Sequence, residues 1–357
     1  MEFNKIFNAK SVGIRVTEDP NNNIAYAGAA FFPDLTTMGI DMKWFLLNKV
    51  VGTALKPSAF NAMSTIRPRK GFEGKVQEMP LFRESMKIDE RDLLDIQRAE
   101  SKNDPYLLEI IDHIYDDTTA LIEGANISAE RMRMNLLAPV NGEMKIVIGM
   151  ADNTLYSYNY DPEGEWKKEH YLEITSGSTW DKPQAAKPLT DIRQGTNYLK
   201  ANGSAPAYAM MTSKTFEYLA ENEQVQNAFV TSSGKAVDFI DTETLKDVFR
   251  RKTGLIPLLY DKVFVDYDEN STKKNFFPDD YVTIIGATKL GNTHRGITPE
   301  QRTLMGDNAA DVYVLNNGIA IATKTTYGPP VVQEVTASML ALPSFEGMND
   351  IFTLKVK

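Results

Sequence analysis

Cysteine is absent from this chain, and histidine is scarce. The absence of cysteine excludes disulfides, thiolate metal sites and cysteine nucleophiles. The three histidines, His113, His170 and His294, lie far apart, and no H-E-x-x-H pattern or spaced cluster that could bind zinc is present. We therefore expect each histidine to be structural or exposed, and we predict no metal and no organic cofactor.

Signatures of nucleotide and acyl chemistry are also missing. The stretch Ser233-Gly-Lys-Ala236 lacks the first glycine and the hydroxyl residue of a phosphate-binding loop. No G-x-G-x-x-G or G-x-S-x-G pattern occurs either. Many Asp and Glu residues are available, but no pattern pairs two of them for catalysis. We therefore predict that the chain is not an enzyme and that it has no catalytic residues.

Long apolar runs and excess positive charge are lacking as well. No apolar run approaches the ~18 residues that span a bilayer, and residues 1–10 show no apolar core of a secretory signal. We expect a soluble, cytoplasmic chain without membrane contact. The net charge is −9, from 39 Lys and Arg against 48 Asp and Glu. Because tight phosphate binding needs clustered basic residues, this balance disfavours sequence-specific nucleic-acid binding.

A long helix is the strongest pattern that is present. Asp104 and Pro105 are typical of a helix start. Apolar or small residues then recur at three- and four-residue spacing, which predicts one buried face of a long helix. These positions are Leu107, Ile111, Ile114, Thr118, Leu121 and Ala125.

Strand patterns follow the helix. Residues 154–160 and 166–174 predict a hairpin joined by a turn at Asp161–Gly164. From 191 to 311 strand patterns alternate with helices that begin near Ser213 and Asp241. The predicted strands are Tyr208–Met211, Leu255–Tyr260, Val263–Val265 and Tyr281–Ile285. With 357 residues, the chain is long enough for two domains. We predict an α+β fold.

Two segments have little apolar content of their own. Residues 1–30 show no sustained period and read equally well as an extended arm or a frayed terminus. Residues 60–90 are punctuated by glycine and proline and predict a protruding β-hairpin. A local cluster of basic residues lies there, at Arg67, Arg69, Lys70 and Lys75. These four are candidate contacts to an acidic neighbouring subunit, and a solvated loop tip explains them equally well.

Three segments carry a resemblance to a known family. The first is Ser176-Gly-Ser-Thr-Trp180 with Pro188-Leu-Thr-Asp-Ile192 downstream. The second is Lys273-Lys-Asn-Phe-Phe-Pro-Asp-Asp280 with Val282-Thr-Ile-Ile-Gly286. The third is Ser338-Met-Leu-Ala-Leu-Pro343 followed by a final strand at 351–356. In order and spacing, from about residue 30 to the end, the chain resembles the lambda-type major capsid (head) proteins of tailed bacteriophages.

The resemblance implies the capsid fold named after phage Hong Kong 97. It implies an N-terminal arm (1–30), a peripheral domain with a long spine helix (31–59, 91–190 and 312–345), an extended loop (60–90), an axial domain (191–311) and a final strand (346–357). It also implies a chain that self-assembles through hexamers and pentamers into the icosahedral head of a tailed phage or prophage, around double-stranded DNA. Expected partners are a scaffolding protein, a portal and a decoration protein. The expected location is the virion head, after assembly in the host cytoplasm.

Three alternatives stay open at this point. An encapsulin-like compartment shares the fold but encloses an enzyme cargo. An acidic two-domain hydrolase would need a pocket of convergent carboxylates, and the sequence names none. A phage tail or connector protein would form rings or tubes instead of closed shells.

Overall fold

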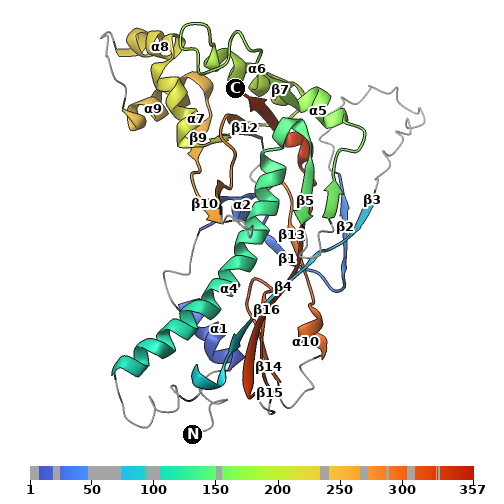
Figure 1. Cartoon of the computed structure of the whole chain (residues 1–357). Helices are drawn as coiled ribbons and strands as arrows, with labels where there is room; N and C mark the ends of the chain where they lie inside the picture. Colours follow the sequence, from blue (N-terminus) through green and yellow to red (C-terminus); the bar gives the residue numbers. More distant parts are fainter. Residues whose placement is uncertain are drawn as a thin grey trace, which may run out of the picture. The chain divides into compact units, whose positions relative to one another are not determined.

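The computed structural model describes residues 8–18, 25–46, 74–92, 94, 105–149, 155–233, 241–265, 272–286, 289–303, 310–326, 328 and 330–357. Helices and strands are mixed, as the predicted α+β class requires (Figure 1). The chain divides into two compact units. The first unit combines Met1–Met42, Val76–Arg133 and Asn292–Ser344, and the second combines Lys43–Lys75, Met134–Gly291 and Phe345–Lys357.

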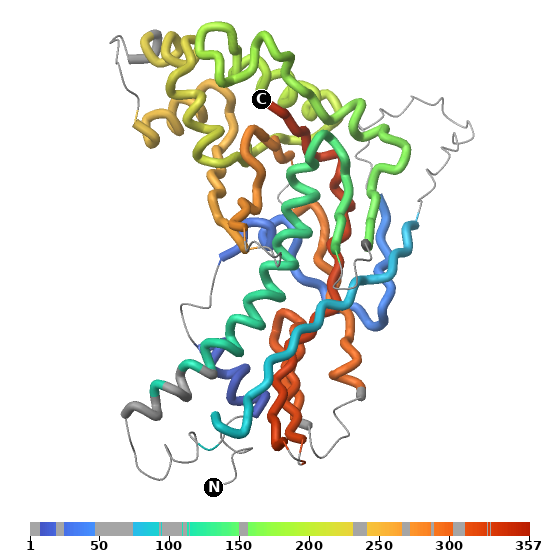
Figure 2. The backbone as a smooth tube through the Cα atoms, viewed as in Figure 1, coloured from blue at the N-terminus to red at the C-terminus, as the bar shows by residue number. Residues whose placement is uncertain are grey.

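The sheet of the first unit is built on strand β16. Its seven-residue stretch from Val332 to Ser338 pairs with one neighbour while eight residues from Gln333 to Leu340 pair with another, so much of β16 is hydrogen-bonded on both sides. Figure 2 shows how strands distant in sequence converge there. The strands are β16 (Val332–Pro343), β4 (Leu81–Ile88), β13 (Thr293–Gly296), β15 (Ala320–Thr326), β14 (Ala310–Val314) and β1 (Asp34–Thr36). Only β1 runs parallel to its neighbour, β13.

Helix α4 (Pro105–Leu137) begins at the predicted proline and spans 33 residues. Of the predicted buried face, Thr118 and Ala125 are buried and Leu121 is half-buried. The side chains of Leu107, Ile111 and Ile114 lie outside the described residues. The second half of the helix therefore packs as its spacing predicts, and the burial of its first half stays a prediction.

The first 30 residues are not simply extended, because two helices form within them. Helix α1 (Ala9–Glu18) begins with a reciprocal cap: Ser11 N–H donates to Asn8 Oδ1 at 2.8 Å, and Asn8 N–H donates to Ser11 Oγ at 3.1 Å. This is the capping-box arrangement, with Ser11 in the place of the usual Glu or Gln. Helix α2 (Ala27–Phe31) follows. For the described residues, the expectation of an extended arm was wrong because local capping stabilises helix.

The predicted loop at 60–90 also differs in its boundaries. Its final stretch, β4, pairs with β16 at eight positions, from Leu81 with Leu340 to Ile88 with Gln333. Strand β3 (Gly74–Glu78) pairs with β2 (Asp41–Phe45), which precedes residue 60. The hydrogen-bonded ribbon is therefore formed by 41–45 and 74–78, and residues 47–73 lie outside the described residues.

The second unit has a five-stranded sheet covered by helices. The sheet order is β7 (Tyr171–Glu173), β17 (Ile351–Lys355), β12 (Tyr281–Ile285), β8 (Tyr208–Met211) and β9 (Ile256–Leu259). The helices are α5 (Glu165–His170), α6 (Pro188–Ala201), α7 (Ser213–Glu221), α8 (Glu223–Ser233) and α9 (Thr242–Thr253). Strands β8, β12 and β10 (Val263–Val265) lie where the sequence predicts them, and β9 falls within its predicted stretch. Asp241 caps α9 as predicted.

One predicted hairpin in this unit was wrong. Strand β6 (Leu155–Asn159) pairs with the preceding β5 (Lys145–Gly149), and residues 165–170 form helix α5 instead of a returning strand. A helix forms here because Trp166 and His170, four residues apart, lie on one helical face and are both buried. A second small ribbon pairs β10 (Val263–Val265) with β11 (Lys273–Asn275). Among the described helices, none is long and apolar enough to cross a membrane.

The two units do not follow the predicted domain limits at 190/191 and 311/312. They are separated at 133/134 and 291/292 instead. Contact density defines these units, whereas the prediction concerns a division by position in a shell. The division into arm, loop, peripheral and axial domains therefore stays a prediction.

Candidate assembly surfaces

The ribbon formed by β2 and β3 is the first candidate surface. At one end Met79 N–H donates to Ile40 O at 2.8 Å, and at the other Phe45 packs beside Gly74. The two strands therefore run antiparallel. A two-stranded ribbon is marginally stable alone, so it needs support from a neighbouring surface.

The two faces of this ribbon differ in burial. Met42 and Trp44 point inward and are buried, whereas Phe45 and Val76 are exposed. The inward face gives the ribbon its support within the chain. The outward face carries exposed apolar groups, which makes it a candidate for contact with another molecule.

Of the four predicted contact residues, the structure describes only Lys75. Arg67, Arg69 and Lys70 lie outside the described residues. Lys75 lies in β3, where its Nζ donates to Tyr160 O at 3.0 Å and sits 5.3 Å from the centre of the Trp44 ring. Trp44 packs on Tyr160 with ring centres 5.5 Å apart. Lys75 is thus engaged within its own chain, and its contact with another subunit stays a prediction.

A buried charge cluster fixes the strand that precedes the ribbon. Asp34, in β1, accepts hydrogen bonds at the same oxygen, Oδ1, from two arginines. Arg133 Nη2 of α4 lies 2.8 Å away and Arg295 Nε of β13 lies 2.9 Å away. The side chains of Arg133 and Arg295 are 4% and 3% exposed. Two desolvated cations therefore share the Asp34 carboxylate, whose side chain is 32% exposed.

The same cluster extends to the short helix α2. Glu130 of α4 is fully buried, accepts from Gly28 N–H at 2.8 Å and lies 3.5 Å from Arg133 Nη1. Arg133 Nε donates to Thr293 Oγ1 at 2.8 Å, and that hydroxyl donates to Phe32 O at 2.9 Å. Two cations and two carboxylates balance in charge. They hold residues 28–34 against α4 and β13.

The electrostatics follow from burial. Desolvation lowers the pKa of Arg295, and the neighbouring Asp34 carboxylate opposes that shift. Burial, and then the carboxylates of Glu123 and Glu130, raise the pKa of Tyr26 to about 12. Tyr26 precedes α2, so its hydroxyl stays neutral beside this cluster at physiological pH. The cluster therefore holds β1 and α2 against α4 and β13 through charged hydrogen bonds.

The sequence analysis missed this cluster. Its members are distant in sequence, and only Glu130 and Arg133 are close enough to be recognised as a helical i,i+3 pair. Asp34 and Arg295 carry no local pattern. Their meeting depends on the parallel pairing of Leu35 with His294, which no local pattern encodes.

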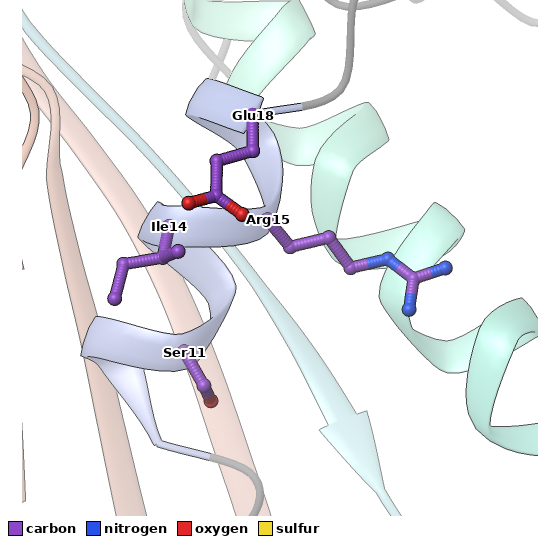
Figure 3. A pocket seen from close by; sticks show the side chains of 4 residues that line it. All are labelled: Ser11, Ile14, Arg15 and Glu18. Carbon is purple, nitrogen blue, oxygen red and sulfur yellow. The ribbon is translucent and has the colours of Figure 1, made fainter.

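A shallow hollow of about 440 Å³ lies beside α1 and is lined by Ser11, Ile14, Arg15 and Glu18 (Figure 3). Ser11 is occupied in the helix cap, and Arg15 points toward α4, where it lies 4.7 Å from the centre of the Tyr115 ring. These groups serve the packing of α1. Within the part of the chain that the structure describes, no group of three or more His, Asp or Glu residues is placed to hold a metal ion.

Comparison with known proteins shows which solved structures share this fold. The chain is similar to the capsid protein described for a prophage of E. coli CFT073, with 13% identity and a TM-score of 0.58 over 98% of this chain and 99% of that one. It is also similar to a phage-related protein from Bordetella bronchiseptica RB50 (13% identity, TM-score 0.51, 92% and 91% covered). A third similar structure is the cyanophage A-1(L) capsid (6% identity, TM-score 0.51, 95% and 98% covered). No curated protein matches the chain.

The fold is thus that of the Hong Kong 97-like phage capsid proteins, a class of shell-forming structural proteins. The sequence model of the family described as phage major capsid protein E matches residues 48–317, about three quarters of the chain. The chain belongs to that family, and it is a shell-forming capsid protein of a phage or prophage, located in the virion head. The predicted resemblance is confirmed, although its third segment lies beyond the matched residues.

Proposed function

We propose that this chain self-assembles into a closed icosahedral head around the double-stranded DNA of a tailed phage or prophage. The observation that supports this most is the family match across residues 48–317, together with a fold shared along nearly the whole chain. Hexamers and pentamers of one chain are the symmetric way to close such a shell. The net charge of −9 suits an inner surface that does not trap packaged DNA through multiple phosphate contacts.

Finer features complete the proposal. Residues 1–30 act as the arm, the part of 60–90 that precedes β4 as the extended loop, 191–311 as the axial domain and 346–357 as the final strand. The peripheral domain comprises 31–59, 91–190 and 312–345. Separate scaffolding, portal and decoration proteins assist assembly in the host cytoplasm. The chain has no enzymatic role, and hydrolase activity lost on a single Asp or Glu substitution would contradict this part of the proposal.

Electron microscopy of the purified chain tests the function directly. We expect closed icosahedral particles. Rings or tubes would support a connector or tail protein instead. Particles isolated from infected or induced cells should contain nuclease-protected DNA, and a protein cargo without DNA would support an encapsulin-like compartment.

The basic cluster is tested by charge reversal. The triple variant Arg67→Glu, Arg69→Glu and Lys70→Glu should fold normally but assemble poorly. Each exposed pair is worth only ~0–1 kcal/mol, but a shell repeats the loss at every subunit. A matched control reverses three exposed basic residues elsewhere, Lys187, Arg193 and Lys200. Sedimentation across a salt series measures both. Equal yields and salt responses for the triple variant and the wild type would remove these charges from the proposal.

A further inference from the structure

Four large apolar side chains near the ribbon are exposed. Their exposed fractions are 44% for Leu35, 90% for Met38, 54% for Ile40 and 40% for Leu81. Single exposed apolar residues are ordinary on protein surfaces. A group of this size in one place is different, because contiguous apolar patches of several hundred Å² typically mark interaction sites.

Strand register places two of them on one face of the sheet. Leu35 of β1 pairs with His294 of β13, and Leu81 of β4 pairs with Leu340, which in turn pairs with Gly296 of β13. His294 and Gly296 are two residues apart, and such residues share a face of a strand. Leu35 and Leu81 therefore emerge on the same side of the sheet.

The turn that carries the other two lies on this side as well. A Cβ built on Gly296 would come within 2.8 Å of Gly39 O and 2.9 Å of Met79 Cε, so the turn crosses over this glycine. Gly39 itself has φ 113°, which only glycine adopts readily. Met38 and Ile40 flank Gly39. The bare backbone of Gly296 thus lets the turn cross β13 next to Leu340, the residue that pairs with Leu81.

Helix α4 covers the opposite face. Arg295 lies between His294 and Gly296 in β13, so its side chain leaves the other side of the sheet. There it meets Asp34 and, through it, Arg133 of α4. We call the exposed group of Leu35, Met38, Ile40 and Leu81 the apolar patch. It occupies the sheet face turned away from α4.

The patch has an acidic border toward the ribbon. Asp41 follows Ile40 and Glu78 precedes Met79, and both are exposed. Basic residues cluster in sequence at Arg67, Arg69 and Lys70 and again at Arg250, Arg251 and Lys252. A second copy of this chain is an abundant neighbour in any shell. Its basic residues complement the negative charge of this border.

We propose that the apolar patch is an assembly contact that a second copy of this chain covers when the shell forms. This inference rests on the proposed function and assigns particular residues to it. Burying four apolar groups supplies the favourable free energy, and the acidic border adds orientation. A charge at the centre of the patch would then be desolvated without a partner, which opposes assembly and leaves the isolated subunit unaffected.

Met38→Lys is the decisive variant because Met38 is 90% exposed and its replacement has almost no folding cost. We expect an unchanged thermal unfolding curve and a yield of closed particles reduced by about tenfold or more at matched concentration. Met38→Leu should assemble like the wild type. Val140→Lys, at an exposed valine in the second unit, is the matched control and should also assemble normally.

A labelling experiment measures coverage itself. The chain has no cysteine, so Met38→Cys introduces a single thiol. Its reaction with a maleimide should be about tenfold slower or more in particles than in dissociated subunits. A thiol in Met38→Cys particles that reacts as fast as in dissociated subunits, or efficient assembly of Met38→Lys, would overturn this inference alone. A wild-type chain that never forms particles would instead contradict the proposed function.

Discussion

Strand β1 and helix α6 are each attached to a sheet, but by opposite chemistry. In the first unit β1 depends on Asp34, whose single oxygen serves two buried arginines. In the second unit α6 lies on an apolar layer, where Gly195 allows close approach to Phe352 and Ile284. Apolar packing spreads its stabilisation over many atoms. The charge cluster concentrates it on one group, so the first unit should be more sensitive to a single substitution.

The largest expected effect is therefore at Asp34. Asp34→Asn leaves two buried arginines with only Glu130 as a counter-charge, and breaking such a cluster costs about 3 kcal/mol or more. Denaturant unfolding should show this loss, with Asp41→Asn in the neighbouring strand as an exposed control that changes little. Equal stability of the two variants would show that water or a rearranged side chain compensates, and the contrast between the units would fail.

A smaller effect is expected when a methyl group is added to α6. A Cβ on Gly195 would lie 2.7 Å from Phe352 Cδ1 and 2.9 Å from Ile284 Cδ1. Gly195→Ala should therefore destabilise the fold by about 1–2 kcal/mol. The same change at Gly124 in α4, where no atom lies within 4 Å, should stabilise by about 0.5–1 kcal/mol. Thermal unfolding of both variants gives the comparison, and shifts of the same sign would refute the close packing of α6.

His170 sharpens the comparison because it is a polar exception in the second unit. It stacks on Trp166, meets Tyr198 edge-on and bonds Ile351 O through Nδ1 at 2.9 Å. Burial lowers its pKa, against the opposing effects of the Ile351 carbonyl and the Glu169, Asp350 and Asp161 carboxylates.

A lowered pKa in the folded state means that the unfolded chain binds this proton more readily. Stability should be complete above pH about 6.5 and should fall as the pH drops below it. Denaturant unfolding at several pH values measures the slope. His170→Gln should reduce that slope, because glutamine does not titrate, whatever it does to stability at neutral pH. Parallel curves for variant and wild type would assign the pH dependence to other groups.

The smallest expected effect is at the cap of α1. Asn8→Ala removes the acceptor for Ser11 N–H and should cost about 1 kcal/mol. Asn8→Asp keeps the acceptor and should be nearly neutral. Because α1 packs on the sheet of the first unit, the cost should appear in global unfolding. If only helix content changes, α1 unfolds independently of that sheet.

Much of the fold could be predicted because its signals are local. Pro105 marks the start of α4, Asp241 caps α9, and strands such as Tyr208–Met211 follow from short apolar runs between turn residues. The prediction of helix or strand failed where an element is too short to show a clear period in its apolar residues. Helix α5 has six residues, and its Trp166 and His170 fit a strand pattern nearly as well as a helical one.

The candidate surfaces could be predicted only in part. The ribbon follows from glycine and proline content, but its partner strand β2 depends on pairing that no local pattern encodes. The apolar patch is more hidden still. Leu35 and Leu81 are far apart in sequence, and each alone is an ordinary exposed leucine. Only the order β1, β13, β16, β4 places them on one face of the sheet.

The late position of β16 in the chain determines when the sheet of the first unit can form during synthesis. The ribosome makes β4, β13 and β15 before β16, yet each of the three pairs with it. Gln333 must find Ile88 across most of the chain, and contacts of such long range fold slowly. A product that ends before residue 332 lacks the strand on which the others pair. Chains that terminate before residue 332 therefore cannot form the finished sheet, and we expect a growing particle to exclude them.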